Sequence, residues 1–322
     1  MKRSISGNPS IAPGALAGLL AVLVAVLGSG CGSVAVKKGD SAGDPIVAAP
    51  TQVAHTSEGA VGYRSVGSGP GLLLITGYAA DMDDWPPAVV NALARSHRVI
   101  TIDNAGVGET SELRQPLSVD KMAAQVDAFL RTLHLGPIAV LGWSMGGFIA
   151  QALAVDHSRD VARLVLCATA PGNGKATLPT AAARAALARP NNLTGIEDML
   201  FPGNQQGKEV PAFAAQIAEY PDSYRPPLSA DVAQSSASSA WLAGRDPAGR
   251  QLARIMAPTL IDDGEDDIAL PARNDELLHS EIPGSHLVLY PDAGHGFFFQ
   301  DRATWVSQVD SFLGSSPRQA GS

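Results

Sequence analysis

Short apolar segments alternate with segments of helical periodicity along most of the chain after residue 60. The apolar segments occupy 71–76, 98–103, 138–143, 163–169, 258–263 and 285–290. Continuous apolar runs of this length predict strands that are buried on both faces, as in a parallel sheet. Helical periodicity is found at 86–96, 118–134, 145–157, 272–282 and 302–313. Because strands and helices alternate, we predict an α/β fold with a mostly parallel central sheet flanked by helices.

The alternation is interrupted at 172–250, a stretch rich in Ala, Pro and Ser. It contains helical pieces and no convincing strand, and we interpret it as a helical lid inserted over the carboxyl edge of the sheet. Within it, the run SSASSA at 235–240 is typical of a loop or a helix cap. The core of the predicted α/β fold then consists of residues 58–171 and 251–315.

The N-terminus has the pattern of an export signal. A basic pair is followed by a short apolar run at 15–27, and small residues stand directly before Cys31. This pattern resembles a bacterial lipoprotein signal, in which residues 1–30 are removed and Cys31 is acylated. It implies attachment to the membrane surface, on the outer face of the bacterial cell membrane, with 31–57 as a flexible tether. An ordinary secretory signal and an uncleaved anchor are the alternatives.

Composition and charge narrow the possible functions. The chain has 45% hydrophobic and 17% charged residues, a balance typical of globular proteins. Its net charge of −8 and the absence of a basic stripe argue against a nucleic-acid partner. With Cys31 acylated, Cys167 is the remaining one of two cysteines, so no intrachain disulfide is expected. Cys167 lies in an apolar run, and we interpret it as a buried structural thiol.

The segment GWSMGG at 142–147 has the pattern Gly-x-Ser-x-Gly and stands between a predicted strand and a predicted helix. This is the setting of a nucleophile elbow, in which a serine occupies a sharp, strained turn. Gly142 and Gly146 fit this interpretation, because side chains there would collide with the neighbouring strand and helix. Ser144 is therefore a candidate nucleophile, against the alternative of a simple Gly-Ser turn.

A nucleophilic serine requires a base and a supporting acid. Of the seven histidines, His295 follows the last predicted strand and is flanked by small residues, so a loop can project its imidazole over the sheet edge. The segment after the strand 258–263 offers five carboxylates, namely Asp262, Asp263, Glu265, Asp266 and Asp267. The residues themselves do not choose among these five, and Asp103, at the end of its own strand, is a further candidate.

Taken together, the motifs resemble those of the α/β-hydrolase superfamily, and most closely its cofactor-free haloperoxidase-like and esterase-like members. The resemblance covers about residues 60 to 313 without the lid, and its motifs occur in family order: ITGYAADMDDW (75–85), DNAGVGETS (103–111), GWSMGG (142–147), GEDDIALP (264–271) and PDAGHGF (291–297). Five motifs in the correct order are far more specific than any one of them.

The resemblance implies a role for each site residue. Ser144 would be the nucleophile, His295 the base and Asp267 the acid. The backbone N–H groups of Tyr78 and Met145 would form the oxyanion hole. The chain departs from the family at Thr76, where a histidine usually precedes the glycine of this loop.

These expectations describe a serine hydrolase that cleaves a carboxylic ester or a related acyl bond of a small-molecule substrate. No metal or organic cofactor is implied, because the sequence has neither a His/Cys cluster with ligand spacing nor a dinucleotide fingerprint. A perhydrolase, or cofactor-free haloperoxidase, would use the same residues. A proline-type aminopeptidase would need lid carboxylates such as Glu197, Asp198, Glu219 or Asp222. A non-catalytic surface protein that only binds a ligand is the remaining alternative.

Overall fold

A computed structural model describes residues 45–187, 195, 199–221 and 226–314. The chain divides into two units, Met1–Gly39 and Asp40–Ser322, and all described residues belong to the second. The predicted signal at 1–30 and its acylated Cys31 lie outside the described residues. Within the described ranges, no helix is both long and apolar enough to cross a membrane.

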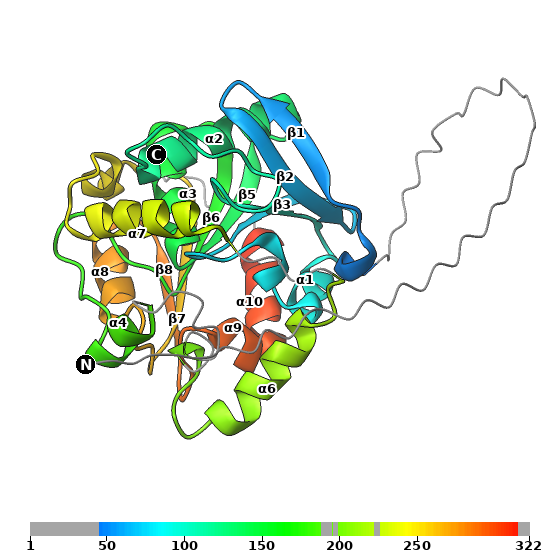
Figure 1. The fold of residues 1–322 in the computed structure, drawn as a ribbon. Helices are drawn as coiled ribbons and strands as arrows, with labels where there is room; N and C mark the ends of the chain where they lie inside the picture. Colours follow the sequence, from blue (N-terminus) through cyan, green and yellow to red (C-terminus); the bar gives the residue numbers. More distant parts are fainter. Residues whose placement is uncertain (1–44, 188–194, 196–198, 222–225, 315–322) are drawn as a thin grey trace, which may run out of the picture. The chain divides into compact units, whose positions relative to one another are not determined.

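An eight-stranded sheet forms the centre of the second unit, with the strand order β1-β2-β4-β3-β5-β6-β7-β8 (Figure 1). From β4 to β8 all neighbours are parallel, whereas β2 pairs antiparallel with both β1 and β4. The strands are β1 (Gln52–Thr56), β2 (Gly59–Val66), β3 (Gly71–Ile75), β4 (Arg98–Ile102), β5 (Ile138–Trp143), β6 (Val161–Cys167), β7 (Thr259–Gly264) and β8 (His286–Tyr290). The predicted α/β fold class is confirmed.

Helices cover both faces of this sheet (Figure 1). One apolar cluster joins the sheet to α2, α3 and α8, and a second joins its other face to α1 and α10. The helices are α1 (Pro87–Leu93), α2 (Val119–Thr132), α3 (Met145–Asp156), α4 (Ala181–Leu187), α6 (Gln206–Ile217), α7 (Leu228–Leu242), α8 (Arg273–Glu281), α9 (Phe297–Gln300) and α10 (Arg302–Gly314). Four 3₁₀ turns are also described: η1 (Ile46–Ala48), η2 (Met82–Asp84), η3 (Ala248–Arg250) and η4 (Leu252–Arg254).

The predicted tether at 31–57 is too long, because its last part is folded. Ile46 in η1 is only 1% exposed, and its backbone N–H donates to Asn91 Oδ1 at 2.9 Å. Strand β1 then pairs with β2 at the edge of the sheet. The sequence did not predict this strand because an edge strand buries few side chains and therefore lacks an apolar run. In β1 only Ala54 is buried. The folded unit therefore begins at or before residue 45.

The described residues of 172–250 form α4, α6, α7 and η3 and contain no strand. The assignment of 235–240 to a loop or cap is wrong, because these residues lie inside α7. The buried face of α7 consists of Ala230, Gln234, Ala237 and Trp241, at spacings of three and four residues. These spacings are the period of an α-helix. The serines of 235–240 lie between these buried positions. Helix α7 packs against α2 and α3.

Candidate active site

Ser144 stands between the end of β5 at Trp143 and the start of α3 at Met145. Its backbone angles, φ 57° and ψ −121°, lie in a region that a residue with a side chain rarely adopts. Both flanking glycines are needed there. A methyl group on Gly142 would lie 2.3 Å from the Gly146 carbonyl oxygen, and one on Gly146 would lie 2.1 Å from that of Ile75. The turn thus presents a partly exposed serine on a strained backbone.

His295 and Asp267 are hydrogen bonded in the loops that follow β8 and β7. His295 Nδ1 lies 2.7 Å from Asp267 Oδ2, and His295 is only 3% exposed. The other carboxylate oxygen, Asp267 Oδ1, accepts from the backbone N–H groups of Ala269 at 2.6 Å and Leu270 at 3.0 Å. Because an ionised carboxylate can only accept, the proton of the bond lies on Nδ1 and Nε2 is left free to take a proton.

The other carboxylates of this loop have different partners. Asp262 accepts from the indole N–H of Trp305 at 3.2 Å, and Glu265 and Asp266 are exposed. Asp263 Oδ1 accepts from the Gly264 N–H at 2.7 Å. Burial raises the pKa of Asp263 and of the neighbouring Asp275. Among the five candidates, the one that resemblance selected is thus the one bonded to His295.

Asp262 makes the stability of the protein depend on pH. Burial raises its pKa to about 8, whereas an unfolded aspartate titrates near 3.9. Between these values the folded state binds more protons, so the free energy of unfolding falls as pH rises from about 4 to 8. We expect the free energy of unfolding of Asp262→Asn to rise relative to that of the wild type by up to roughly 1.4 kcal/mol for each pH unit across this range. Denaturant unfolding at several pH values measures the difference.

The exposed Asp266 supplies the control for this prediction, because Asp266→Asn removes a carboxylate of the same loop that faces solvent. Because the side chain faces solvent, the unfolding free energy of this variant should stay close to that of the wild type. If the Asp262→Asn curve is also parallel to that of the wild type, folding does not raise the pKa of the Asp262 carboxyl.

Ser144 and His295 do not form a hydrogen bond with each other within the described residues. Trp143, however, connects the two segments: its indole N–H donates to the His295 carbonyl oxygen at 3.0 Å, and the two rings lie 5.5 Å apart. The residue before the serine therefore fixes the backbone that carries the histidine. Catalytic hydrogen bonds are often long before substrate binds. Sequence reasoning missed Trp143, and its signal was an aromatic residue inside the Gly-x-Ser-x-Gly motif.

The loop after β3 runs beside Ser144. A methyl group on Gly77 would lie 3.3 Å from Ser144 Cβ and 3.7 Å from its Oγ. Asn104, another residue that sequence reasoning missed, donates to the carbonyl oxygens of Thr76 at 2.9 Å and Gly77 at 3.3 Å. Thr76 is fully buried, and among the described residues its hydroxyl has no hydrogen-bond partner. The histidine that usually stands here is thus replaced by a side chain that makes no polar contact.

Tyr78 and Met145 are the two residues expected to supply oxyanion donors. Met145 is the first residue of α3, so its N–H has no acceptor within the helix. The N–H groups at this helix terminus also carry a partial positive charge. Tyr78 follows Gly77, next to the serine, and its hydroxyl donates to Asp231 on α7. Burial, reinforced by this bond, raises the pKa of Tyr78.

Elsewhere in the described residues, Asp127, His157 and Asp160 bring three potential metal-ligand atoms within 4.8 Å of one another. Asp127 already has partners there, since it pairs with Arg131 at 3.1 Å and with His157 at 3.2 Å. Burial and the neighbouring Asp127 raise the pKa of Asp160. These contacts describe a cluster of polar side chains between α2 and the end of α3.

Comparison with known proteins gives consistent matches. The profile of the family described as alpha/beta hydrolase fold matches residues 70–302. A Mycobacterium tuberculosis protein with the provisional name non-heme bromoperoxidase BpoC is 29% identical over 269 aligned positions, which cover 78% of this chain and 96% of the relative. A poly(3-hydroxyalkanoate) depolymerase of Ectopseudomonas oleovorans is 30% identical over 249 aligned positions, which cover 74% of this chain and 82% of the relative. A solved structure, that of an alpha/beta hydrolase fold protein from Chitinophaga pinensis, matches with a TM-score of 0.73 and 26% sequence identity. The match covers 85% of this chain and 100% of that protein.

Proposed function

Because the chain belongs to the α/β-hydrolase fold family and is an enzyme, we propose that it is a serine hydrolase acting on carboxylic esters or related acyl bonds. The observation that carries this proposal is the 2.7 Å bond between His295 and Asp267, in a loop that Trp143 ties to the strained Ser144. Such an arrangement can lower the barrier to attack by an otherwise weak nucleophile.

In the proposed mechanism, Nε2 of His295 takes the hydroxyl proton as Ser144 Oγ attacks the substrate carbonyl carbon. Asp267 holds the imidazole in the required tautomer and stabilises the imidazolium. The negative charge on the carbonyl oxygen is stabilised by the N–H groups of Tyr78 and Met145. His295 then gives its proton to the leaving alcohol, and the acyl group remains on Ser144.

Water completes the cycle by the same route. His295 takes a proton from water, hydroxide attacks the acyl carbon, and the proton returns to Ser144 Oγ as the acid leaves. The helices of 172–250 act as the proposed lid, with α7 next to the oxyanion loop. The acyl pocket between lid and core would set the preferred chain length.

A panel of nitrophenyl esters of increasing acyl length tests this function. Hydrolysis with burst kinetics, together with labelling of Ser144 by a fluorophosphonate, is the expected result. Labelling located by mass spectrometry identifies the modified serine directly. An enzyme that neither hydrolyses any ester or thioester nor reacts with the probe would contradict the proposal.

A second candidate is perhydrolysis, which the name of the mycobacterial relative favours. Here hydrogen peroxide replaces water, attacks the acyl-enzyme and leaves as a peracid, while Ser144 recovers its proton through His295. The peracid can then oxidise bromide without any bound metal. Running the ester panel with and without peroxide, and following peracid formation, separates the two reactions.

The structure gives no support to a proline-type aminopeptidase. Three of its four candidate carboxylates, Glu197, Asp198 and Asp222, lie outside the described residues. The fourth, Glu219, is exposed just after the end of α6. An exposed carboxylate is solvated and does not by itself form a pocket for a substrate amine.

We further propose that the mature protein is anchored to the outer face of the bacterial cell membrane through an acylated Cys31. The support is the sequence pattern before this residue. Cys31→Ala should move the protein from the membrane fraction to the soluble fraction, because the acyl chains supply the membrane affinity. Fractionation after a high-salt wash measures this. A variant that still sediments with membranes would point to an uncleaved anchor.

A further inference from the structure

Helix α7 places one polar side chain on its otherwise apolar buried face. Gln234 shares this face with Ala230, Ala237 and Trp241, and it is 0% exposed. A buried amide is unfavourable unless its donor and acceptor are both satisfied. The partners of Gln234 therefore explain why this side chain is tolerated between α7 and the core.

Both ends of the Gln234 amide bind backbone groups of separate loops. Its Oε1 accepts from the Ala79 N–H at 3.0 Å, and its Nε2 donates to the Ala105 carbonyl oxygen at 3.1 Å. Ala79 belongs to the loop after β3, and Ala105 to the loop after β4. Nearby on α7, Asp231 accepts from the Tyr78 hydroxyl. Helix α7 thus bridges both loops beside the nucleophile.

These contacts fix the peptide groups on either side of Tyr78. The Gly77 carbonyl and the Tyr78 N–H share one peptide plane, which Asn104 holds at the carbonyl. The next plane contains the Ala79 N–H, which Gln234 holds. Ala79 has φ 52°, a left-handed conformation unfavourable for alanine, so the surrounding contacts must maintain it. Releasing the second plane would let residue 78 rotate.

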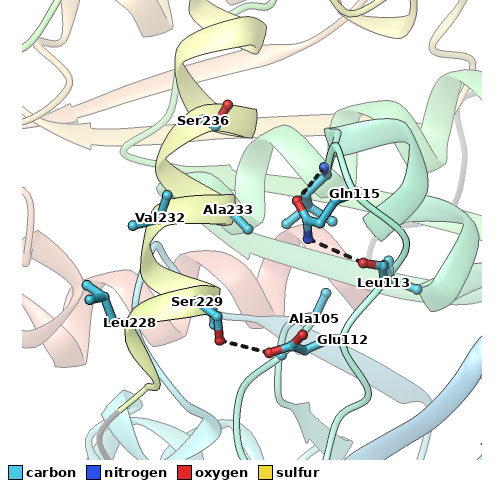
Figure 2. Close-up of a pocket in the computed structure, with 12 residues that line it drawn as sticks. Ala105, Glu112, Leu113, Gln115, Leu228, Ser229, Val232, Ala233 and Ser236 are labelled. Carbon is cyan, nitrogen blue, oxygen red and sulfur yellow. Dashed lines mark hydrogen bonds between the residues drawn. The ribbon is translucent and has the colours of Figure 1, made fainter.

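On the side that faces the segment after Ala105, α7 is not closely packed. A pocket of about 560 Å³ lies there. Figure 2 shows it between α7 and the segment of Glu112, Leu113 and Gln115. Leu228 and Val232 on α7 are exposed. Across this pocket the Ser229 hydroxyl donates to Glu112 Oε1 at 2.8 Å (Figure 2). The amide of Gln234 therefore carries more of the alignment between α7 and the oxyanion loop than packing on this side does.

We propose that Gln234 is a positioning residue for the oxyanion hole: it orients the Tyr78 N–H by holding the adjacent peptide group from α7. The inference rests on the proposed serine hydrolase function. It makes α7 a part of the catalytic framework in addition to a cover for the substrate. A displaced donor binds the oxyanion of the transition state less well than an aligned one, whereas substrate binding elsewhere in the site is unaffected.

Gln234→Met tests the proposal, because methionine has a similar length but makes neither hydrogen bond. Losing an entire oxyanion donor lowers kcat about 10²–10³-fold, so misaligning one should lower kcat roughly 10–100-fold, with KM within about threefold. Affinity for a boronic acid, whose tetrahedral adduct needs the same N–H groups, should fall in parallel. Asparagine is one methylene too short to reach both loops, so Gln234→Asn should also lower kcat and the affinity for the boronic acid. This variant is the substitute test if the methionine variant does not fold.

Gln151→Met is the matched control. Gln151 is also fully buried on a helix, α3, and donates to the Ala170 carbonyl oxygen at 3.2 Å. Because Gln151 Oε1 has no hydrogen-bond partner within the described residues, this variant should lose less stability than Gln234→Met, and it should keep its kcat. Wild-type kcat in folded Gln234 variants, or equal losses of kcat in the Gln151 variant, would overturn the inference. If the wild type neither hydrolyses esters nor reacts with fluorophosphonate, the proposed function itself fails.

Discussion

Replacing Ser144 with alanine should lower kcat/KM for ester hydrolysis by at least three orders of magnitude. The nucleophile of the proposed acyl-enzyme is then missing, and only oxyanion stabilisation and substrate binding remain, worth about 10³–10⁴ over the reaction in water. The fold should tolerate the change, because the Ser144 side chain makes no hydrogen bond within the described residues. The melting temperature should therefore stay within about 3 °C of the wild type. Steady-state kinetics and calorimetry give both numbers.

Ser307→Ala is the control for a serine change without a chemical role, since Ser307 is exposed on α10. It should match the wild type in both measurements. Fluorophosphonate labelling should disappear in the Ser144 variant and persist in the Ser307 variant. Turnover near the wild-type value in purified Ser144→Ala protein would remove Ser144 from the mechanism.

Asp267→Asn should be nearly as damaging, lowering kcat about 10⁴-fold while the shape of the site is kept. The structure determines how the new amide would lie. The backbone N–H groups of Ala269 and Leu270 bind Oδ1, so the asparagine oxygen would remain there and its NH₂ group would face His295. His295 Nδ1 would then have to accept, which places the ring proton on Nε2. In that tautomer the ring cannot take the proton from Ser144.

Asp266→Asn separates this effect from a general change in loop charge. Asp266 is the sequence neighbour of Asp267 but is exposed, so its variant should stay within several-fold of the wild type. If the Asp266 variant is inactive and the Asp267 variant is active, the acid of the triad is Asp266. If both remain active, Asp103 is the next carboxylate to replace, although its Oδ1 accepts from the Met82 N–H at 2.8 Å.

The sequence predicted strands β3 to β8 because each reads as a continuous apolar run. The five inner strands of this set are largely buried, whereas β8 at the edge of the sheet is only partly buried, so its expected burial on both faces is wrong. The sequence missed the β1–β2 hairpin for the opposite reason. Strand β2 carries Arg64, which is buried but satisfied by Asp83 at 2.5 Å and lies over the ring of Tyr220. A charge inside a strand breaks the apolar pattern, and its partners are too distant in sequence to be recognised.

The candidate site divides in a similar way. Ser144 could be located because a nucleophile elbow constrains its neighbours to be glycine, a local requirement that leaves a local pattern. Asp267 could not be distinguished from four other carboxylates by residue type, since what separates them is the direction in which the loop turns each side chain. The supporting residues Asn104, Trp143 and Gln234 bind backbone groups far away in sequence. Contacts of this kind leave no recognisable motif.

The folded position of Ile46 limits how far from a membrane the enzyme could work. Under the proposed acylation, the connection from Cys31 to this buried residue is 15 residues, at most about 50–55 Å when fully extended. A tether reaching to residue 57 would have allowed about 90 Å. The shorter connection would keep the catalytic unit within a thin layer above the lipid headgroups. Its reachable substrates would then be molecules that diffuse along that surface or are released from it.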